Sequence, residues 1–223
     1  MKIICDNTIT AKQEQLQILE SLATKWNRQI TIEQGAVPED LSLLSEADLA
    51  LIFLILPNNR KKIRQYLECA RELRMPYTFL TDQMQMPQNV KKVLLPIGFL
   101  EEEVGKAQYA AAFGRFCGAE ITIVQPNDYG SRAEKNIQKS IELFDKFELN
   151  YNIVKGKKDS FKIEQEAASM ASNLQADILI MSSSRDYGLD DILFGPKEQH
   201  VIQKSHIPVM LVNPRKDLYS LCD

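Results

Sequence analysis

The chain has 223 residues, of which 44% are hydrophobic and 26% charged, as is typical of a globular protein with one or two domains. Its formal charge is −3, from 27 Lys and Arg against 30 Asp and Glu, whereas nucleic-acid-binding proteins usually carry a basic excess. The longest apolar run, residues 47–56, is too short to span a bilayer, which takes about 20 residues. We therefore expect neither a nucleic-acid partner nor a membrane partner.

The N-terminal segment and the cysteines bear on the cellular compartment. The first residues, MKIICDNT, lack the apolar core of a signal peptide. The cysteines are widely scattered and form no C-x-x-C motif; they are Cys5, Cys69, Cys117 and Cys222. We therefore expect a cytoplasmic protein whose thiols are reduced.

The first part of the chain alternates short apolar runs with helical patterns. Strands are predicted at residues 2–5, 29–32, 47–56 and 77–80, and a helix follows the first of them because Leu16, Leu19, Leu22 and Trp26 share one face. The basic run from Arg60 to Arg64 predicts a solvated helix face, since no aromatic residues interleave. Between Gln34 and Ala47 there is room for only one short helix, so we expect this half to lack a helix and an edge strand.

The second part repeats this alternation in fuller form. Strands are predicted at residues 93–97, 120–124, 151–154, 176–181 and 209–212. Helices are predicted over residues 101–117, around 137–144, over 163–174, and from Gly195-Pro196 to about His206. Strands that alternate with helices predict right-handed crossovers, and hence an α/β fold with a doubly wound parallel sheet.

Short segments of the two parts resemble each other, which indicates two tandem domains. Gln29-Ile30-Thr31-Ile32 parallels Glu120-Ile121-Thr122-Ile123, and Ala47-Asp48-Leu49 parallels Ala176-Asp177-Ile178. We predict an abbreviated α/β domain over residues 1–85 and a fuller α/β domain over residues 90–215. Residues 83–88 are the expected linker, and residues 216–223 form a C-terminal tail.

The segment from Ala176 to Val212 predicts a strand, a polar loop, a helix and a strand, and here the sequence resembles the universal stress protein family. In that family the loop carries the pattern G-x2-G-x9-G-S, which wraps the phosphates and ribose of ATP. The four key positions fall on Ser182, Arg185, Gly195 and Pro196, so one of four matches. The resemblance implies an adenine nucleotide alpha hydrolase-like fold with strand order 3-2-1-4-5, and domains that contact each other through their last strands.

This loop lacks the groups that would hold a triphosphate. Glycine at the first two positions would let the backbone approach phosphates, whereas Ser182 and Arg185 add Cβ atoms there. Pro196 has neither an N–H nor a hydroxyl, and proline is favoured at a helix start without any ligand. In the first part the corresponding loop is only Pro57-Asn58-Asn59, too short to wrap a phosphate. We therefore expect no tight ATP binding and no other cofactor.

A degenerate nucleotide or anion site in the second part is the competing hypothesis. Serine hydroxyls, the Arg185 guanidinium and a lysine at the helix start could bind an anion there. Gly98 takes part because it follows the first strand of this half, where the family carries an acidic residue; Phe99 and Leu100 beyond it are expected to pack. The simpler interpretation is a polar turn whose serine side chains form hydrogen bonds with nearby backbone groups. The candidate residues are Gly98, Ser182, Ser183, Ser184, Arg185, Gly195 and Lys197.

The sequence offers no catalytic set and no metal site. His200 and His206 are the only histidines, and neither has further ligands at metal spacing or a nucleophile motif. Glu101, Glu102 and Glu103 form a charge run at a helix start, where carboxylates are favoured without a catalytic role. We expect a non-enzymatic stress-response or signalling module that acts through an unidentified protein partner and forms a homo-oligomer, such as a dimer. The alternative is a nucleotide- or anion-binding regulatory module.

Overall fold

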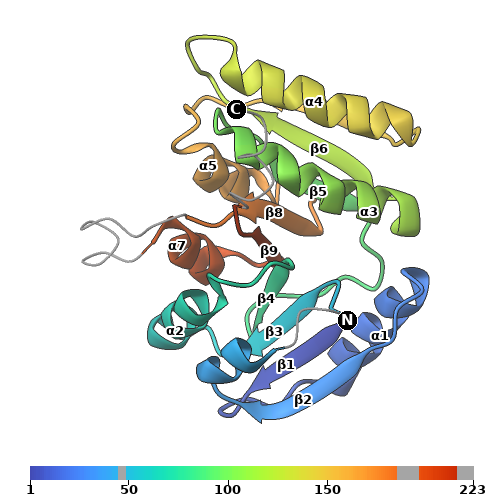
Figure 1. The fold of residues 1–223 in the computed structure, drawn as a ribbon, viewed down its shortest axis with the longest axis vertical. Coiled ribbons are helices and arrows are strands. Elements are labelled where there is room, and N and C mark those ends of the chain that lie inside the picture. The colour runs from blue at the N-terminus through green and yellow to red at the C-terminus, as the bar shows by residue number, and fades with distance from the viewer. Residues whose placement is uncertain (45–48, 185–195, 215–223) are drawn as a thin grey trace. The chain divides into compact units, whose positions relative to one another are not determined.

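The computed structural model describes residues 1–44, 49–184 and 196–214, and these residues form two compact units. The first unit contains Met1–Asn89 and Ser183–Asn213, and the second contains Val90–Ser182 together with Pro214. Each unit is an α/β structure built on a mostly parallel sheet (Figure 1), which confirms the predicted fold class. The domain limits at 1–85 and 90–215 stay a prediction, and the tail at 216–223 lies outside the described residues. No described helix is long and apolar enough to cross a membrane.

The first unit has the strand order β2-β1-β3-β4-β9. Strands β1 to β4 are parallel, and β9 runs antiparallel to β4. The last strands of the two sequence passes therefore pair, as the family resemblance implied. The elements of this unit are β1 (Lys2–Asp6), α1 (Gln13–Lys25), β2 (Thr31–Ala36), η1 (Pro38–Leu43), β3 (Ile52–Leu56), α2 (Arg60–Ala70), β4 (Tyr77–Thr81), α7 (Lys197–Lys204) and β9 (Val209–Val212).

Chain direction explains how the first unit is layered. Because β2 and β4 lie on opposite sides of the β1–β3 pair, right-handed crossovers place α1 and α2 on opposite faces of the sheet. Strands β3 and β4 are buried along their whole length, whereas the edge strand β2 is mostly exposed. Helix α2 packs beside α7 (Figure 1). Between β2 and β3 the described residues contain only the short helix η1, as the sequence predicted.

The second unit has the strand order β8-β5-β6-β7, and its neighbouring strands are all parallel. This order confirms the first four strands of the expected 3-2-1-4-5 arrangement, and the fifth strand, β9, belongs to the first unit. Helices α3 and α4 pack together, whereas the crossover through α5 runs back past β5 and so lies on the other face. The elements are β5 (Lys92–Pro96), η2 (Glu101–Lys106), α3 (Ala107–Cys117), β6 (Glu120–Gln125), α4 (Arg132–Lys146), β7 (Tyr151–Lys155), α5 (Ile163–Met170) and β8 (Ile178–Ser182).

The helix predicted over residues 101–117 is divided in the structure. Glu101–Lys106 form the 3-10 turn η2, and α3 starts only at Ala107. The backbone before η2 is bonded to another helix: the Asn136 side chain of α4 donates to the carbonyls of Gly98 and Leu100, each at 2.9 Å. Helix α3 ends at Gly118, which adopts a left-handed conformation (φ 66°) and donates its N–H to Gly114.

Candidate functional site

The carboxyl edge of the second sheet brings two of the predicted ligand residues together. Gly98 follows β5, and Ser182 ends β8, the parallel neighbour of β5. Strands β8 and β6 flank β5 on opposite sides, so the strand order reverses at β5. In open α/β sheets ligands bind outside the carboxyl ends of strands at such a switch point. The structure therefore places Gly98 and Ser182 where a ligand of this fold is expected.

The backbone amides at this edge are already bonded to the protein's own carboxylates. The Gly98 N–H donates to Glu103 Oε2 at 2.5 Å, and the Ser182 N–H donates to Glu164 Oε1 at 2.8 Å. Lys106 Nζ lies 3.1 Å from Glu103 Oε2 and 3.4 Å from Glu164 Oε1. These three residues, the Glu–Lys–Glu cluster, have side chains that are 8% (Glu103), 0% (Lys106) and 4% (Glu164) exposed.

The electrostatics of the Glu–Lys–Glu cluster are unfavourable for an anionic ligand. Two carboxylates and one ammonium lie close together in a region shielded from water. Charges interact more strongly in such a region than in water. A phosphate placed here would meet carboxylates and would also have to compete with them for the Gly98 and Ser182 amides. The Gly98 and Ser182 amides, which could otherwise bind an anion, are therefore already bonded within the chain.

Gly98 is required by how closely the Glu103 carboxylate approaches the backbone. A Cβ atom at this position would lie 2.9 Å from Glu103 Oε1 and 3.1 Å from the Ser160 Cβ atom. Glu103 can therefore take this position only because residue 98 has no side chain.

The apolar pair after Gly98 behaves differently at its two positions. The Phe99 ring is half-buried and packs edge-on against Phe161, with ring centroids 5.0 Å apart. Leu100 is 41% exposed. Packing was the expectation for both residues, and it is confirmed for Phe99.

Three other predicted ligand residues lie in the first unit. The Ser183 N–H donates to the Val212 carbonyl at 3.1 Å, and its hydroxyl bonds to Asn213 Oδ1. The Ser184 N–H donates to the carboxylate of Glu198, a residue only 1% exposed. Lys197 is the first residue of α7, which starts after Pro196. The remaining two candidates, Arg185 and Gly195, lie outside the described residues.

Glu198 therefore repeats the behaviour of the two glutamates in the second unit. Gly98, Ser182 and Ser184 were singled out as possible ligand donors, and each gives its amide hydrogen to a buried glutamate of the chain. Charge-assisted hydrogen bonds of this kind are about twice as strong as neutral ones. An incoming anion would have to displace them.

The first unit has its own buried acid at the end of β1. Asp6 is fully buried and accepts hydrogen bonds from the Thr8 N–H (2.9 Å), the Thr8 hydroxyl (2.5 Å) and Lys62 Nζ (2.9 Å). Burial raises the pKa of Asp6, but the hydrogen bonds from Thr8 and Lys62 outweigh it and the pKa is lowered overall. Burial, with the nearby Asp6 charge, raises the pKa of Tyr66. Lys62 was expected on a solvated helix face, so that prediction is wrong for this residue, although Arg60 and Lys61 are exposed.

The sequence contained a signal for the Glu–Lys–Glu cluster that the pattern analysis missed. Lys106 stands four and seven residues before Ala110 and Phe113, so it shares their fully buried helix face. Glu164 stands in the same way three and seven residues before the buried Ala167 and Ala171. An ionisable residue in phase with an apolar face predicts a buried charge that needs a partner.

Metal binding finds no support in the part of the chain that the structure describes. Within residues 1–44, 49–184 and 196–214, no group of three His, Cys, Asp or Glu side chains could hold a metal ion. Cys5 and Cys69 are free thiols, and burial raises the pKa of each.

Comparison with known proteins agrees with this architecture. A sequence model of the universal stress protein family matches residues 89–213. The structure is similar to a universal stress protein from Archaeoglobus fulgidus DSM 4304, with a TM-score of 0.62 and 14% identity over 96% of this chain and 85% of that one. A functionally unknown protein from Pseudomonas aeruginosa PAO1 gives a TM-score of 0.58 and 13% identity over 98% and 83%. At these identities the likeness is one of fold, and it extends over nearly the whole chain. No curated protein matches the chain in sequence.

Proposed function

The chain belongs to the universal stress protein family, and we propose that it is a non-catalytic stress-response or signalling module of the cytoplasm. In this proposal it acts through protein contacts and binds no adenine nucleotide tightly.

The observation that carries the proposal is the occupation of the expected ligand edge by glutamates. Glu103 and Glu164 accept the amide hydrogens of Gly98 and Ser182 in the second unit. Buried Lys106 is shared between the two carboxylates, so its charge is already neutralised. Phosphate binding in the family depends on free amides at a helix start and on close approach of the backbone. In this proposal the Glu103 and Glu164 carboxylates take the place of the ligand's anionic groups.

The surface of the second unit supports the part of the proposal that concerns protein contacts. Phe116 is 42% and Phe147 37% exposed, and the Arg115 guanidinium carbon lies 5.5 and 4.5 Å from their ring centroids. Aromatic residues and arginine are enriched in protein interfaces. Ile153, on β7 at the edge of the sheet among the described strands, is 46% exposed and adds apolar surface there.

Thermal unfolding in the presence of ATP, ADP, AMP and sulfate tests the nucleotide part of the proposal. We expect none of the four to raise the unfolding temperature, whereas a ligand at 100 times its Kd would stabilise the protein by about 2.7 kcal/mol. A rise of several degrees with ATP would overturn the proposal. A rise with sulfate as well would support the anion-binding alternative.

A matched variant shows whether the carboxylate charges are responsible. Glu103→Gln combined with Glu164→Gln keeps acceptor oxygens near Gly98 and Ser182 but leaves Lys106 as an uncompensated cation. We expect sulfate to stabilise this variant and not the parent protein. If sulfate affects neither, the carboxylates are not what excludes anions. Phosphate release from ATP above a protein-free blank would contradict the non-catalytic assignment.

Sedimentation velocity tests the proposed self-association. We expect the protein to sediment as a homo-oligomer, and Phe116→Ser with Phe147→Ser to shift it toward the monomer if these rings line the contact. Leu100→Ser is a suitable control, because Leu100 is as exposed as Phe116 but belongs to a different part of the second unit. A parent protein that is monomeric at high concentration would limit the proposal to contacts with other proteins.

A further inference from the structure

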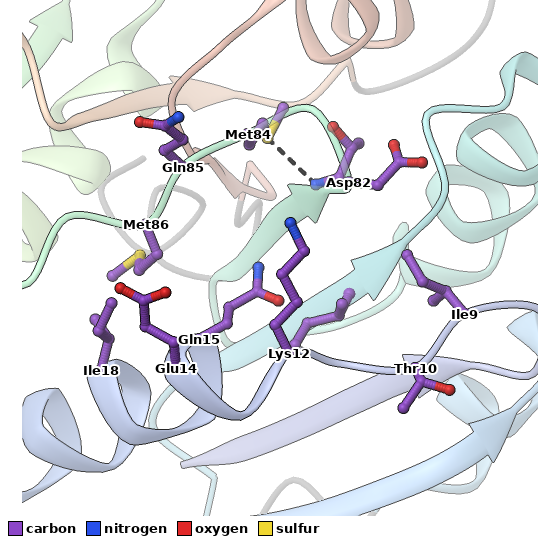
Figure 2. A pocket seen from close by; sticks show the side chains of 12 residues that line it. Ile9, Thr10, Lys12, Glu14, Gln15, Ile18, Asp82, Met84, Gln85 and Met86 are labelled. Atoms are coloured by element: carbon purple, nitrogen blue, oxygen red, sulfur yellow. Dashed lines mark hydrogen bonds between the residues drawn. The ribbon is translucent and has the colours of Figure 1, made fainter.

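The first unit contains a cavity that none of the family's loop pattern accounts for. Its volume is ≈ 360 Å³, and it lies where β3 and β4 end, between the start of α1 and the segment after β4. Figure 2 shows side chains of the α1 region facing those of residues 82–86 across it. The lining residues are Ile9, Thr10, Lys12, Glu14, Gln15, Ile18, Ile55, Thr81, Asp82, Met84, Gln85 and Met86.

The position of the cavity agrees with that of ligand sites in open parallel sheets. Strands β1 and β3 are neighbours. The chain continues from β1 to β2 on one side and from β3 to β4 on the other, so the strand order reverses between β1 and β3. The cavity is built at the carboxyl end of this sheet, and its size falls within the range of small-molecule sites, about 300–1,000 Å³. Asp6 and Lys62, which bond to each other at the end of β1, do not line it.

Part of the cavity wall is apolar and adaptable. Ile55, Met84 and Met86 are 2%, 6% and 8% exposed, and Ile9 and Ile18 add aliphatic surface. Methionine is unbranched and polarisable, so two of them in one wall can fit an irregular aliphatic group. This wall suits a ligand with a short hydrocarbon tail.

A buried hydroxyl among the lining residues lacks a hydrogen-bond partner. Thr81 is 1% exposed, and its Oγ1 atom has no partner among the residues that the structure describes. Its backbone N–H lies 3.4 Å from the thioether sulfur of Met84. A buried polar group without a partner is unfavourable, and natural proteins contain few of them. A ligand atom that bonds to this hydroxyl would remove the cost.

The charges at the cavity are mixed in sign. Lys12 carries a cation, and Glu14 and Asp82 carry anions. Within the described chain neither Lys12 nor Glu14 forms an ion pair, and Asp82 accepts a hydrogen bond from the Asn58 N–H. One positive and two negative groups disfavour a polyanion such as a nucleoside triphosphate. They are complementary to a molecule that carries both a carboxylate and an ammonium group.

We propose that this cavity binds a free amino acid with an aliphatic side chain. Lys12 would pair with the ligand carboxylate, and Glu14 and Asp82 with its ammonium group. The side chain would lie against Ile55, Met84 and Met86, and the Thr81 hydroxyl would bond to a polar atom of the ligand. This inference is independent of the proposed function, because it concerns the first unit and not the Glu–Lys–Glu cluster.

Methyl NMR of protein labelled with ¹³C at the methionine methyl groups tests this proposal with L-leucine as the probe. We expect the Met84 and Met86 signals, assigned with Met84→Leu and Met86→Leu, to shift saturably, whereas Met170 in the second unit does not. Isopentylamine lacks the carboxylate and 4-methylpentanoate lacks the ammonium group, and each should bind at least tenfold more weakly. No saturable shift with L-leucine, L-isoleucine or L-valine at millimolar concentration would overturn the proposal.

Three variants assign the contacts. Lys12→Gln should weaken L-leucine binding at least tenfold, whereas Lys61→Gln, an exposed lysine of α2 outside the cavity, should leave it unchanged. Thr81→Val has nearly the same shape and removes the unpartnered hydroxyl. It should therefore fold and unfold at an equal or higher temperature while binding L-leucine more weakly. Equal binding by the parent, Lys12→Gln and Thr81→Val would contradict the assigned site, as would equal binding of L-leucine and 4-methylpentanoate.

Discussion

The carboxyl ends of the strands carry different side chains in the two units. In the second unit Glu103 and Glu164 accept the amide hydrogens of Gly98 and Ser182, and both carboxylates pair with Lys106. In the first unit the loop after β3 is only Pro57-Asn58-Asn59, and a cavity of ≈ 360 Å³ lies near the ends of β3 and β4. The glutamate-bonded amides and this cavity therefore lie in different units of the described chain.

This difference shows what decides whether a fold keeps its ligand site. The parallel sheet and its crossovers provide a place for a ligand in both units, because amides and helix starts meet at the strand ends. The side chains at the strand ends then determine whether a ligand can bind there. In the second unit Glu103 and Glu164 bond to backbone amides, whereas in the first unit Thr81, Met84 and Met86 line a cavity.

The largest expected effect comes from removing the shared cation of the second unit. Lys106→Met leaves Glu103 and Glu164 buried without their counter-charge, so the free energy of unfolding should fall by about 3–5 kcal/mol. Urea denaturation measures the change. The triple variant that adds Glu103→Gln and Glu164→Gln should recover part of the loss, because it removes the uncompensated charges. A loss below 1 kcal/mol for Lys106→Met alone would show that the cluster is not a coupled buried unit.

In the first unit the corresponding change is Asp6→Asn. It weakens the hydrogen bonds from Thr8 and the ion pair with Lys62, and should cost about 1.5–3 kcal/mol at neutral pH. Because the folded-state pKa of Asp6 is lowered, its contribution is fully present above the unfolded pKa of about 3.9 and is lost as the pH falls through the folded pKa. The difference between parent and variant should therefore narrow below pH 4. A difference that is constant from pH 7 to pH 3 would contradict the ionised carboxylate.

Gly98→Ala sharpens the comparison at the level of the backbone. The added Cβ atom would meet Glu103 Oε1 at 2.9 Å and Ser160 Cβ at 3.1 Å, and we expect a loss of about 1–3 kcal/mol from overpacking. Thermal and urea unfolding measure it. In a Glu103→Ser background the same substitution should cost less, because one of the two clashing groups is gone. Equal costs in both backgrounds would mean that Glu103 does not press on Gly98.

The smallest effect is expected for an exposed ion pair of the same unit. Lys139 and Glu101 lie 3.0 Å apart with side chains that are 52% and 66% exposed. Lys139→Met should change the unfolding free energy by about 0–1 kcal/mol, since solvent and salt screen such pairs. Comparison with Lys106→Met by the same assay separates burial from mere pairing of charges.

Most of the fold could be predicted because apolar periodicity depends on local sequence. The alternation of strands and helices, the short connection between β2 and β3, and the pairing of β4 with β9 all agree with expectation. The division of residues 101–117 into η2 and α3 could not be predicted, because it depends on Asn136, which reaches the Gly98 and Leu100 carbonyls from another helix.

The candidate site was less predictable than the fold, for a physical reason. Glu103 lies in a run of three glutamates that resembles a solvated helix start, and Glu164 is distant in sequence from Lys106. Only the folded sheet brings them to the ends of β5 and β8. Likewise Thr81 and Lys12 line one cavity although a strand end and a helix start supply them, and no spacing in the sequence connects them.

Nucleotide content of the freshly purified protein tests the central claim most directly. The protein is precipitated with acid, and the supernatant is measured at 260 nm and resolved by ion-exchange chromatography against adenine nucleotide standards. Because the Gly98 and Ser182 amides are bonded to Glu103 and Glu164, we predict far less than one nucleotide per chain, before and after incubation with ATP and desalting. About one adenine nucleotide per chain that survives desalting would contradict the account.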